Sequence, residues 1–217
     1  MNLVVFDLDG TLVESESFEG ELYARAVRTE LGIAIDTDWS CYRHVTDSGI
    51  LDEVLDRSRS NADRSMAQAA VMQAFTELVA DHVAAHDGLL PEIPGASDFV
   101  NALIEHPGVQ VAVATGGWRE TALIKLQAIG IEPGRLPIAS SSDAMSKADI
   151  IRVAERRALP EGGATRRTYV GDSYYDLEMS RQVGYEFMAI GPDVVHRQSQ
   201  SDFCNAELIL GSLGLRC

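Results

Sequence analysis

The sequence predicts an α/β fold, with a Rossmann-like three-layer core around a parallel sheet and an all-helical domain inserted near its start. Two observations lead to this prediction. Beyond residue 95, short apolar strand-like runs alternate with amphipathic helix-like segments, which is the pattern of parallel βαβ units. An apolar strand is also expected at residues 2–7, but no strand-like run follows it between residues 15 and 88. The helical block is therefore expected to interrupt the core directly after its first strand.

The inserted block is expected to contain three helices. Apolar residues at helical spacing indicate the first helix, which Gly32 ends. Thr46 or Asp47 is the expected capping residue of the second helix, and the third is long and rich in alanine. In chain order, these helices are expected at residues 17–31, 47–57 and 62–86.

Proline and glycine residues separate this block from the rest of the core. Pro91 and the pair Pro94-Gly95 break the chain before strands and helices begin to alternate. The predicted division is a core of residues 1–14 and 90–217 with a helical cap domain of residues 15–89. Core helices are expected at residues 96–105, 118–129, 147–158 and 174–183, and core strands at residues 109–114, 136–139, 168–171, 185–190 and 208–210.

The net charge restricts the partners expected for the protein. A formal charge of −15 over 217 residues repels nucleic-acid backbones and anionic membrane surfaces, so neither is expected as a partner. No apolar run approaches the length of a membrane span, and the first residues are typical of a core strand, not of a signal peptide. Cys41, Cys204 and Cys217 lack CxxC spacing and fit a reducing compartment. A cytoplasmic protein, monomeric or homodimeric, is expected.

The most informative segment is residues 4–12, which read Val-Val-Phe-Asp-Leu-Asp-Gly-Thr-Leu. Alternation along the strand places the side chains of Asp7 and Asp9 on the same side, with Leu8 between them. Two carboxylates this close repel each other unless a cation or a shared proton compensates them. Oxygen ligands of this kind favour Mg²⁺. The segment therefore predicts a Mg²⁺-dependent site at the carboxyl end of a buried strand, where open α/β sheets bind ligands.

Polar residues also follow two other predicted strands. Thr115 and Gly116 come after one of them, and Asp172 and Asp176 come after the other, while Lys147 opens a predicted helix. Parallel strands bring their carboxyl ends together, so these groups are expected to meet in one crevice. Carboxylates, a hydroxyl, a lysine and glycine-flanked amides together are suited to binding a metal ion and a phosphate.

These residues resemble the four sequence motifs of the haloacid dehalogenase superfamily of hydrolases, in the family's order. The segment Asp7-Leu8-Asp9-Gly10-Thr11 resembles the first motif, Thr115 the second, Lys147 the third, and Gly171-Asp172-Ser173 with Asp176 the fourth. The helical block is similar to the cap domain of the phosphoglycolate-phosphatase-like branch. Gly116 and Ala148 depart from the pattern, because the family often has a polar residue and a proline at these two positions.

The resemblance implies phosphoryl transfer through an aspartyl-phosphate intermediate. Asp7 would be the nucleophile. Asp9 would protonate the leaving oxygen and then deprotonate the attacking water. This role needs Asp9 protonated at the first step, a state that nearby anions are expected to favour by raising its pKa. Mg²⁺ would be held by the carboxylate of Asp7, the backbone carbonyl of Asp9, and Asp172. Asp176 would orient Lys147 or a metal-bound water. The residues expected to bind the phosphoryl oxygens are Leu8, Asp9, Thr115, Gly116 and Lys147.

Asp9 separates the activities found within this family. The resemblance implies that dehalogenating members lack an acid at this position and that ATPase relatives carry threonine there. The chain is therefore expected to be a Mg²⁺-dependent phosphatase for a small phosphorylated metabolite, such as phosphoglycolate or a sugar phosphate. A sugar phosphomutase similar to β-phosphoglucomutase is the alternative. The third hypothesis is a phosphoaspartate signalling module similar to a receiver domain. The helical insertion argues against it, because a small switch needs no lid.

Substrate specificity is expected to come from the cap and its borders. Glu14 lies where the chain enters the cap, and is either a surface hinge residue or a substrate contact. His44 and Thr46 belong to a polar cluster that either caps a helix or recognises the substrate from the cap. Trp118 and Arg119 either border the leaving-group pocket or pack at a helix start.

Overall fold

The computed structural model, which describes residues 1–59 and 63–215, contains a parallel sheet at the centre of the core. Its six strands among the described residues are β1 (Asn2–Phe6), β2 (Val109–Ala114), β3 (Ile138–Ala139), β4 (Arg166–Gly171), β5 (Glu186–Ile190) and β6 (Ser199–Gln200). They are arranged in the order β3-β2-β1-β4-β5-β6, so the chain starts at the middle of the sheet. β1 pairs in parallel with both β2 and β4, which places their carboxyl ends side by side.

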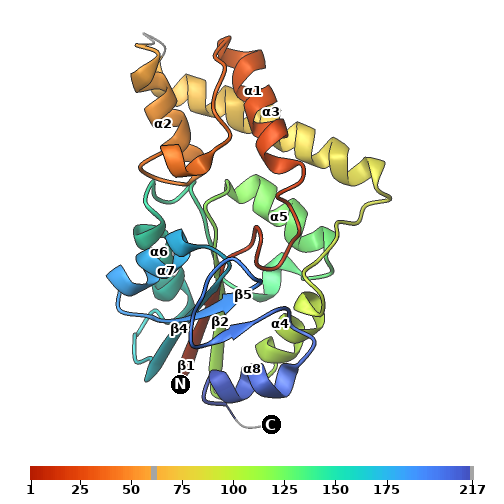
Figure 1. Ribbon diagram of the computed structural model, residues 1–217, viewed down its shortest axis with the longest axis vertical. Helices are drawn as coiled ribbons and strands as arrows, with labels where there is room; N and C mark the ends of the chain where they lie inside the picture. Colours follow the sequence, from red (N-terminus) through yellow and green to blue (C-terminus); the bar gives the residue numbers. More distant parts are fainter. Residues whose placement is uncertain (60–62, 216–217) are drawn as a thin grey trace.

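Helices cover both faces of the sheet and complete the predicted three-layer, Rossmann-like core (Figure 1). Side chains alternate along β1, so Val4 and Phe6 belong to one apolar cluster while Leu3 and Val5 belong to the other. The helices that pack on the Phe6 face are α4 (Ala96–Ile104), α5 (Arg119–Ala128) and α8 (Ala206–Ser212). Those on the opposite face are α6 (Lys147–Ala158) and α7 (Tyr174–Gln182), and the 3₁₀ helix η2 (Pro133–Arg135) precedes β3.

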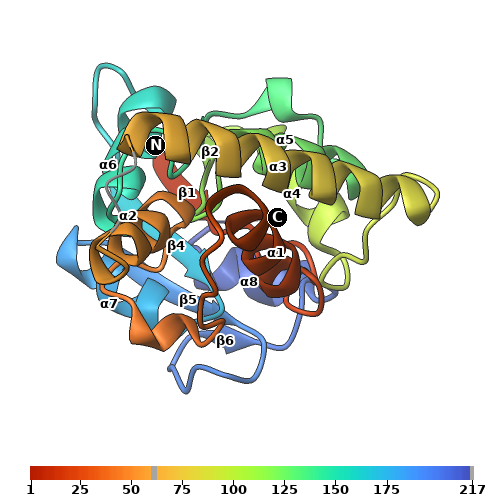
Figure 2. The ribbon, with the colours of Figure 1, turned by 90° about the horizontal axis from the view of Figure 1, so that it is seen from above.

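Three further helices lie beyond the carboxyl ends of the strands (Figures 1 and 2). They are α1 (Glu19–Leu31), α2 (Asp47–Arg57) and α3 (Arg64–Ala85), with the 3₁₀ helix η1 (Trp39–Cys41) between the first two. Their apolar residues form a cluster of their own, in which Tyr23 and Phe75 pack against the ring of Trp118. Trp118 stands at the start of α5, so a core side chain fills the centre of the helical block.

The helices of the inserted block follow the sequence prediction closely. α1 ends at Gly32, which adopts a left-handed conformation with φ of 68°. Thr46 caps α2, because its side chain accepts a hydrogen bond from the amide of Gly49. α3 begins at Arg64; residue 62, where this helix was expected to start, lies outside the described residues. Within the described part of residues 15–88 there is no strand, as predicted.

The predicted strand at residues 208–210 is wrong, because this segment belongs to helix α8. Asn205 caps the helix by accepting the amide of Leu208. Ile209 and Leu213, four residues apart, are buried on one face, whereas Leu208 is 56% exposed. A run of three apolar residues carries no alternation and does not distinguish a helix from a strand. The sixth strand is instead Ser199–Gln200, a polar pair that pairs with β5 at the sheet edge.

No helix among the described residues combines the length and the apolarity that crossing a bilayer requires. Cys41 and Cys204 are exposed and form no disulfide. Cys217 lies outside the described residues.

Candidate active site

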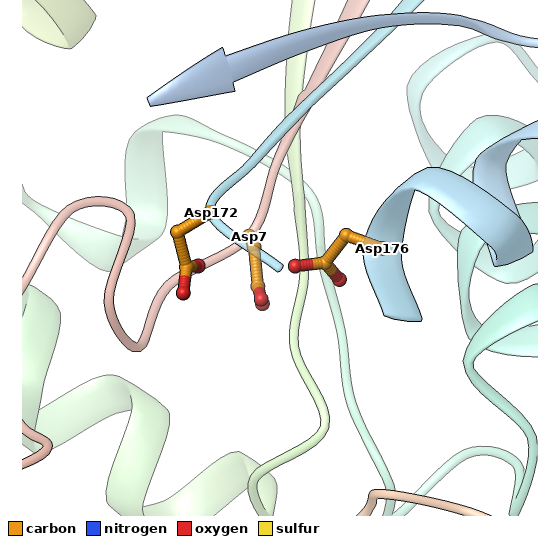
Figure 3. A group of neighbouring side chains, drawn as sticks. All are labelled: Asp7, Asp172 and Asp176. Atoms are coloured by element: carbon orange, nitrogen blue, oxygen red, sulfur yellow. The ribbon is translucent and has the colours of Figure 1, made fainter. Parts of the chain in front are cut away.

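Three carboxylates meet at the carboxyl ends of β1 and β4. Asp7 follows β1, Asp172 follows β4, and Asp176 lies in the first turn of α7. One oxygen of each lies within 4.8 Å of the others, and Figure 3 shows the Asp7 carboxylate between the other two. Ser173 fixes Asp176 through a capping box at the start of α7. Thr11 donates a hydrogen bond of 2.7 Å to Oδ1 of Asp172. The acidic group, as we call these three aspartates, is therefore held in place from several sides.

The turn after β1 brings the chain back beneath the acidic group. Leu8 anchors this turn, because its side chain is fully buried and its carbonyl accepts the amide of Leu12 at 2.8 Å. Gly10 has a φ of +75°, and a Cβ at this position would overlap the carboxylate of Asp172. Glycine is therefore required here both for the backbone conformation and for space.

Lys147 is the cation that contacts the acidic group. Its Nζ lies 2.7 Å from Oδ1 of Asp7 and 3.3 Å from Oδ1 of Asp176. Burial by itself lowers the pKa of Lys147, but Asp176 and Asp7 raise it above its ordinary value, so the ammonium stays charged. Burial and the charge of Asp176 raise the pKa of Asp7 well above its usual range, and raise that of Asp172 to about 7.

The acidic group fits a hard divalent cation. One ammonium does not compensate three closely spaced carboxylates, two of them buried, and the raised pKa values of Asp7 and Asp172 indicate that negative charge is disfavoured there. All three residues offer oxygen, the donor that such cations prefer. Asp176, expected from the sequence only to orient neighbours, lies close enough to the other two carboxylates to belong to this group. The side chain of Asp9 is not part of it.

Asp9 belongs to a second buried network. Its Oδ1 accepts hydrogen bonds of 2.6 Å from Nζ of Lys125 and 2.6 Å from Oγ of Ser15. Its Oδ2 lies 3.5 Å from Oγ1 of Thr115. Lys125 also forms an ion pair with Glu19, the first residue of α1. Asp9 therefore stands between the core helix α5 and the first helix of the inserted block.

This network reverses the expected ionisation of Asp9. Burial by itself raises the pKa of Asp9, but the charge of Lys125 and the hydrogen bonds from Lys125 and Ser15 outweigh burial and hold that pKa below its usual value. In the substrate-free protein, the expectation that neighbouring anions raise the pKa of Asp9 is wrong, because a buried ammonium binds this carboxylate directly. Burial and the charge of Asp9 raise the pKa of Glu19 to about 8.

The segment at residues 45–48, which we call the cap loop, lies directly on the core loop after β2. The amide of Asp47 donates to the carbonyl of Gly116 at 2.9 Å. The carboxylate of Asp47 accepts the amide of Trp118 at 2.8 Å, so a residue of the inserted block caps the core helix α5. Thr46 donates through Oγ1 to the carbonyl of Met145 at 2.7 Å. These bonds hold the inserted block closed over the carboxyl ends of the strands.

The contact with the cap loop explains why position 116, which departs from the family pattern, is a glycine. A Cβ at position 116 would lie 2.8 Å from the carbonyl oxygen of Val45 in the cap loop. We expect Gly116→Ala to lower the free energy of unfolding by about 1–3 kcal/mol, because the cap loop must shift and lose its bonds. Gly211→Ala is the matched control: nothing lies within 4 Å of a Cβ there, and alanine stabilises a helix. If urea unfolding shows equal stability for both variants, the cap loop is not held against Gly116.

A cavity of about 770 Å³ lies between the core and the inserted block. The acidic group, Lys147, Asp9 and Gly116 line its core side. Its other side is lined by residues of the inserted block that include Glu19, Arg28, Trp39, Thr46 and Asp47. Thr115 is fully buried beneath the cavity and accepts the amide of Gly117 through its hydroxyl at 3.0 Å.

Of the five residues predicted for specificity, Thr46 lines this cavity and the other four do not. Glu14 is exposed, which fits a surface hinge residue and not a substrate contact in this cavity. His44 lines a separate groove beside Ser146 and Tyr175. Trp118 is fully buried in the apolar cluster of the inserted block. Of the two expected roles of Trp118, the structure therefore shows packing at the start of a helix. Arg119 is exposed, with its guanidinium 3.3 Å from the carbonyl of Ile138.

Lys125 and Glu19 are site residues that the sequence prediction missed, whereas Asp47 belongs to the polar cluster for which capping or substrate recognition is expected. Lys125 carried a signal, because it lies three residues after Ala122 and four after Thr121, on the face of α5 that is buried. A lysine on the apolar face of a helix requires a buried partner. Glu19 gave no comparable signal, since it stands in the first turn of a helix, where acids are common.

Comparison with known proteins places this geometry in context. The family model described as haloacid dehalogenase-like hydrolase matches residues 4–190. No curated protein sequence matches the chain significantly. CbbY from Rhodobacter sphaeroides in complex with phosphate is similar in structure, with a TM-score of 0.74, 20% identity, and coverage of 99% of this chain and 100% of that one.

Two further solved structures share the fold over nearly the whole chain. A mutant of the same CbbY in complex with xylulose-1,5-bisphosphate has a TM-score of 0.70 and 19% identity, and the match covers 94% of this chain and 96% of that one. β-Phosphoglucomutase from Clostridium difficile has a TM-score of 0.71 and 13% identity, with coverage of 99% and 97%. At these identities the likeness establishes the fold.

Proposed function

The chain belongs to the haloacid dehalogenase-like hydrolases, and from this we propose that it is a Mg²⁺-dependent phosphatase acting on a small phosphorylated metabolite. The observation that carries the proposal is the position of Asp7. This carboxylate is buried at the end of β1, is bonded to Lys147, and lines a cavity of about 770 Å³. The ligands named for the structurally similar CbbY, phosphate and a phosphorylated sugar, support a phosphorylated substrate.

Each residue of the acidic group has a proposed role. Asp7 attacks phosphorus in line with the leaving oxygen and forms an aspartyl phosphate. The carboxylates of Asp7 and Asp172 and the backbone carbonyl of Asp9 would hold Mg²⁺, which supplies positive charge between an anionic nucleophile and an anionic substrate. Lys147 pairs with Asp7 and binds phosphoryl oxygens as they gain charge. Asp176 orients Lys147 through the contact of 3.3 Å.

Asp9 is proposed to move the proton in both half-reactions. It donates to the oxygen of the leaving alcohol as the bond between phosphorus and oxygen breaks, and it then takes a proton from the water that releases phosphate. Its low pKa in the substrate-free state is not the value during transfer, because a phosphate ester brings negative charge close to it and raises that pKa. The phosphoryl oxygens would also meet Thr115 and the amides of Leu8 and Gly116.

The inserted block is proposed to act as a cap domain of residues 15–89 on a core of residues 1–14 and 90–217. The bonds from Thr46 and Asp47 to core carbonyls support a closed cap, which excludes bulk water during transfer. The cavity that it closes has room for a sugar phosphate or a similar small ester.

The proposal is tested by measuring phosphate release from a panel of esters with and without Mg²⁺. The panel covers sugar phosphates, phosphoglycolate, nucleotides and an aryl phosphate. We expect release from at least one ester, in the presence of Mg²⁺ only. Isomerisation of a sugar phosphate without free phosphate would establish a phosphomutase instead. A stably phosphorylated protein without turnover would establish a signalling module, and no release from any ester would contradict the enzyme proposal.

Mg²⁺ binding is expected to depend on pH. The pKa of Asp172 is raised to about 7, so this carboxyl holds a proton below pH 7 in the metal-free protein. Burial and the charge of Asp176 raise the pKa of Asp7 in the same direction. A ligand carboxyl must lose its proton to bind metal. The Mg²⁺ dissociation constant measured by calorimetry should therefore fall by up to ~10-fold between pH 6 and pH 8. Asp172→Asn should weaken binding strongly at both pH values. A dissociation constant independent of pH would contradict this account.

A further inference from the structure

Lys125 is a buried charge for which the proposed chemistry has no direct use. Its side chain is 0% exposed, and it does not line the cavity, so it cannot touch a substrate there. An ammonium in a protein interior is strongly disfavoured unless anions and hydrogen bonds compensate it. Lys125 has two carboxyl groups as partners, those of Asp9 and Glu19. Any effect of Lys125 on the reaction must therefore pass through one of these carboxylates.

The contacts of Lys125 orient the two oxygens of Asp9 differently. Oδ1 is anchored, because it accepts from both Lys125 and Ser15 at 2.6 Å. Oδ2 lies 3.5 Å from the hydroxyl of Thr115, on the side where a phosphoryl group would bind. A carboxylate held by one oxygen presents the other in a fixed direction. That is the geometry that proton transfer to a leaving group requires.

Glu19 extends this arrangement into the inserted block. It is the first residue of α1 and lines the cavity, whereas Lys125 belongs to the core helix α5. The ion pair between them therefore crosses from one part of the molecule to the other. Movement of α1 away from α5 would remove Glu19 from the ammonium that anchors Asp9. The position of α1 and the orientation of Asp9 are thus linked through one side chain.

We propose that Lys125 and Glu19 are positioning residues. While Glu19, at the start of α1, stays bonded to Lys125, they hold Asp9 with one oxygen anchored and the other directed at the leaving group. This inference rests on the proposed role of Asp9 in a phosphatase. Lys125 does not line the cavity and is bonded to Asp9, so its effect should appear in the steps where Asp9 gives or takes a proton.

Two matched aryl esters test the proposal: 4-nitrophenyl phosphate and phenyl phosphate in the presence of Mg²⁺. They have similar shapes, but phenol is the weaker acid and depends more on protonation as it leaves. We expect Lys125→Met to lower kcat/KM for phenyl phosphate ~10-fold more than for 4-nitrophenyl phosphate. Lys125→Arg, which keeps the charge, should recover most of this difference. Arg135→Met, which breaks an exposed ion pair with Glu105, is the control and should change neither value.

A double mutant separates positioning from a general structural role. In the Asp9→Asn background, Lys125→Met should lower kcat/KM less than about twofold further, because a residue that acts through Asp9 has no effect without it. Equal losses on both esters, or full additivity with Asp9→Asn, would overturn the proposal. If Lys125→Met does not fold, Glu19→Ala, which removes the carboxyl group that contacts Lys125 from α1, decides by the same ester comparison. Failure of the phosphatase proposal would look different, since the wild type would then release no phosphate from these two esters or from any other ester of the panel.

Discussion

Asp7→Asn is expected to abolish phosphate release, with kcat at least ~10⁴-fold below that of the wild type. Asparagine has the shape of aspartate, but its amide does not form a phosphoryl bond that water can later hydrolyse. The fold should survive, because Lys147 keeps its contact with Asp176 at 3.3 Å. Removing one of three mutually repelling carboxylates should leave the unfolding temperature unchanged or higher.

The matched control for this variant is Asp98→Asn, which changes an exposed aspartate in the first turn of α4. Phosphate release by Asp98→Asn should equal that of the wild type. Both variants should show the circular dichroism spectrum of the folded protein. If Asp7→Asn turns over at the wild-type rate, Asp7 is not the nucleophile, whatever the other residues do.

Lys147→Met is expected to have the second largest effect, on stability as well as on activity. The substitution leaves the buried carboxylates of Asp7 and Asp176 without their ammonium. Removing one partner of a buried ion pair typically costs about 3–5 kcal/mol. We expect a loss of that order in urea unfolding at pH 8 without Mg²⁺, and a fall in kcat of ~10²-fold or more.

The stability loss of Lys147→Met should depend on pH in a defined direction. The pKa of Asp7 in the folded protein is raised above its unfolded value, so the folded state binds more protons at intermediate pH and loses stability as the pH rises. At pH 5 more of the buried carboxyl is neutral, and the missing ammonium matters less. The difference from the wild type should therefore be smaller at pH 5 than at pH 8. A difference that grows toward pH 5 would contradict the assigned ion pair.

The sheet and the acidic group are the parts of this protein that sequence reasoning predicts well. A buried strand that ends in two carboxylates has few explanations, since charges next to an apolar core need a partner. Parallel topology then brings the ends of neighbouring strands together, and the structure places Asp172 and Lys147 beside Asp7 accordingly. These predictions depend on local patterns and on one general rule of α/β folds.

The ionisation state of Asp9 was not predictable by the same route. It depends on Lys125, which is distant along the chain and belongs to a different helix. A lysine within an amphipathic helix usually lies in solvent, whereas this one is fully buried against Asp9 and against Glu19 of the inserted block. Likewise, Asp47 is expected at the start of its own helix, yet its carboxylate accepts the amide of Trp118 in another. Such contacts are set by how the inserted block sits on the core.

The residues that line the cavity from the inserted block were also difficult to predict from the sequence. Thr46 lines the cavity, whereas His44, two residues earlier, lines a separate groove. Two residues this close in sequence therefore line two different cavities. Arg28 and Trp39, which also line the cavity, belong to segments whose sequence reads as an ordinary surface helix end and a short loop. Residues that face a substrate from an inserted domain become visible only when the two parts are assembled.

The central claim, a covalent phosphate on Asp7, is tested most directly by trapping. The enzyme is denatured during turnover of its best ester and treated with borohydride, which reduces an acyl phosphate to an alcohol but leaves free carboxylates intact. Trypsin then releases the peptide of residues 1–25, since Arg25 is the first basic residue, and tandem mass spectrometry locates the reduced position. We predict reduction at Asp7 in the wild type and none in Asp7→Asn. Reduction at Asp9, or no reduction in an enzyme that releases phosphate, would contradict the account.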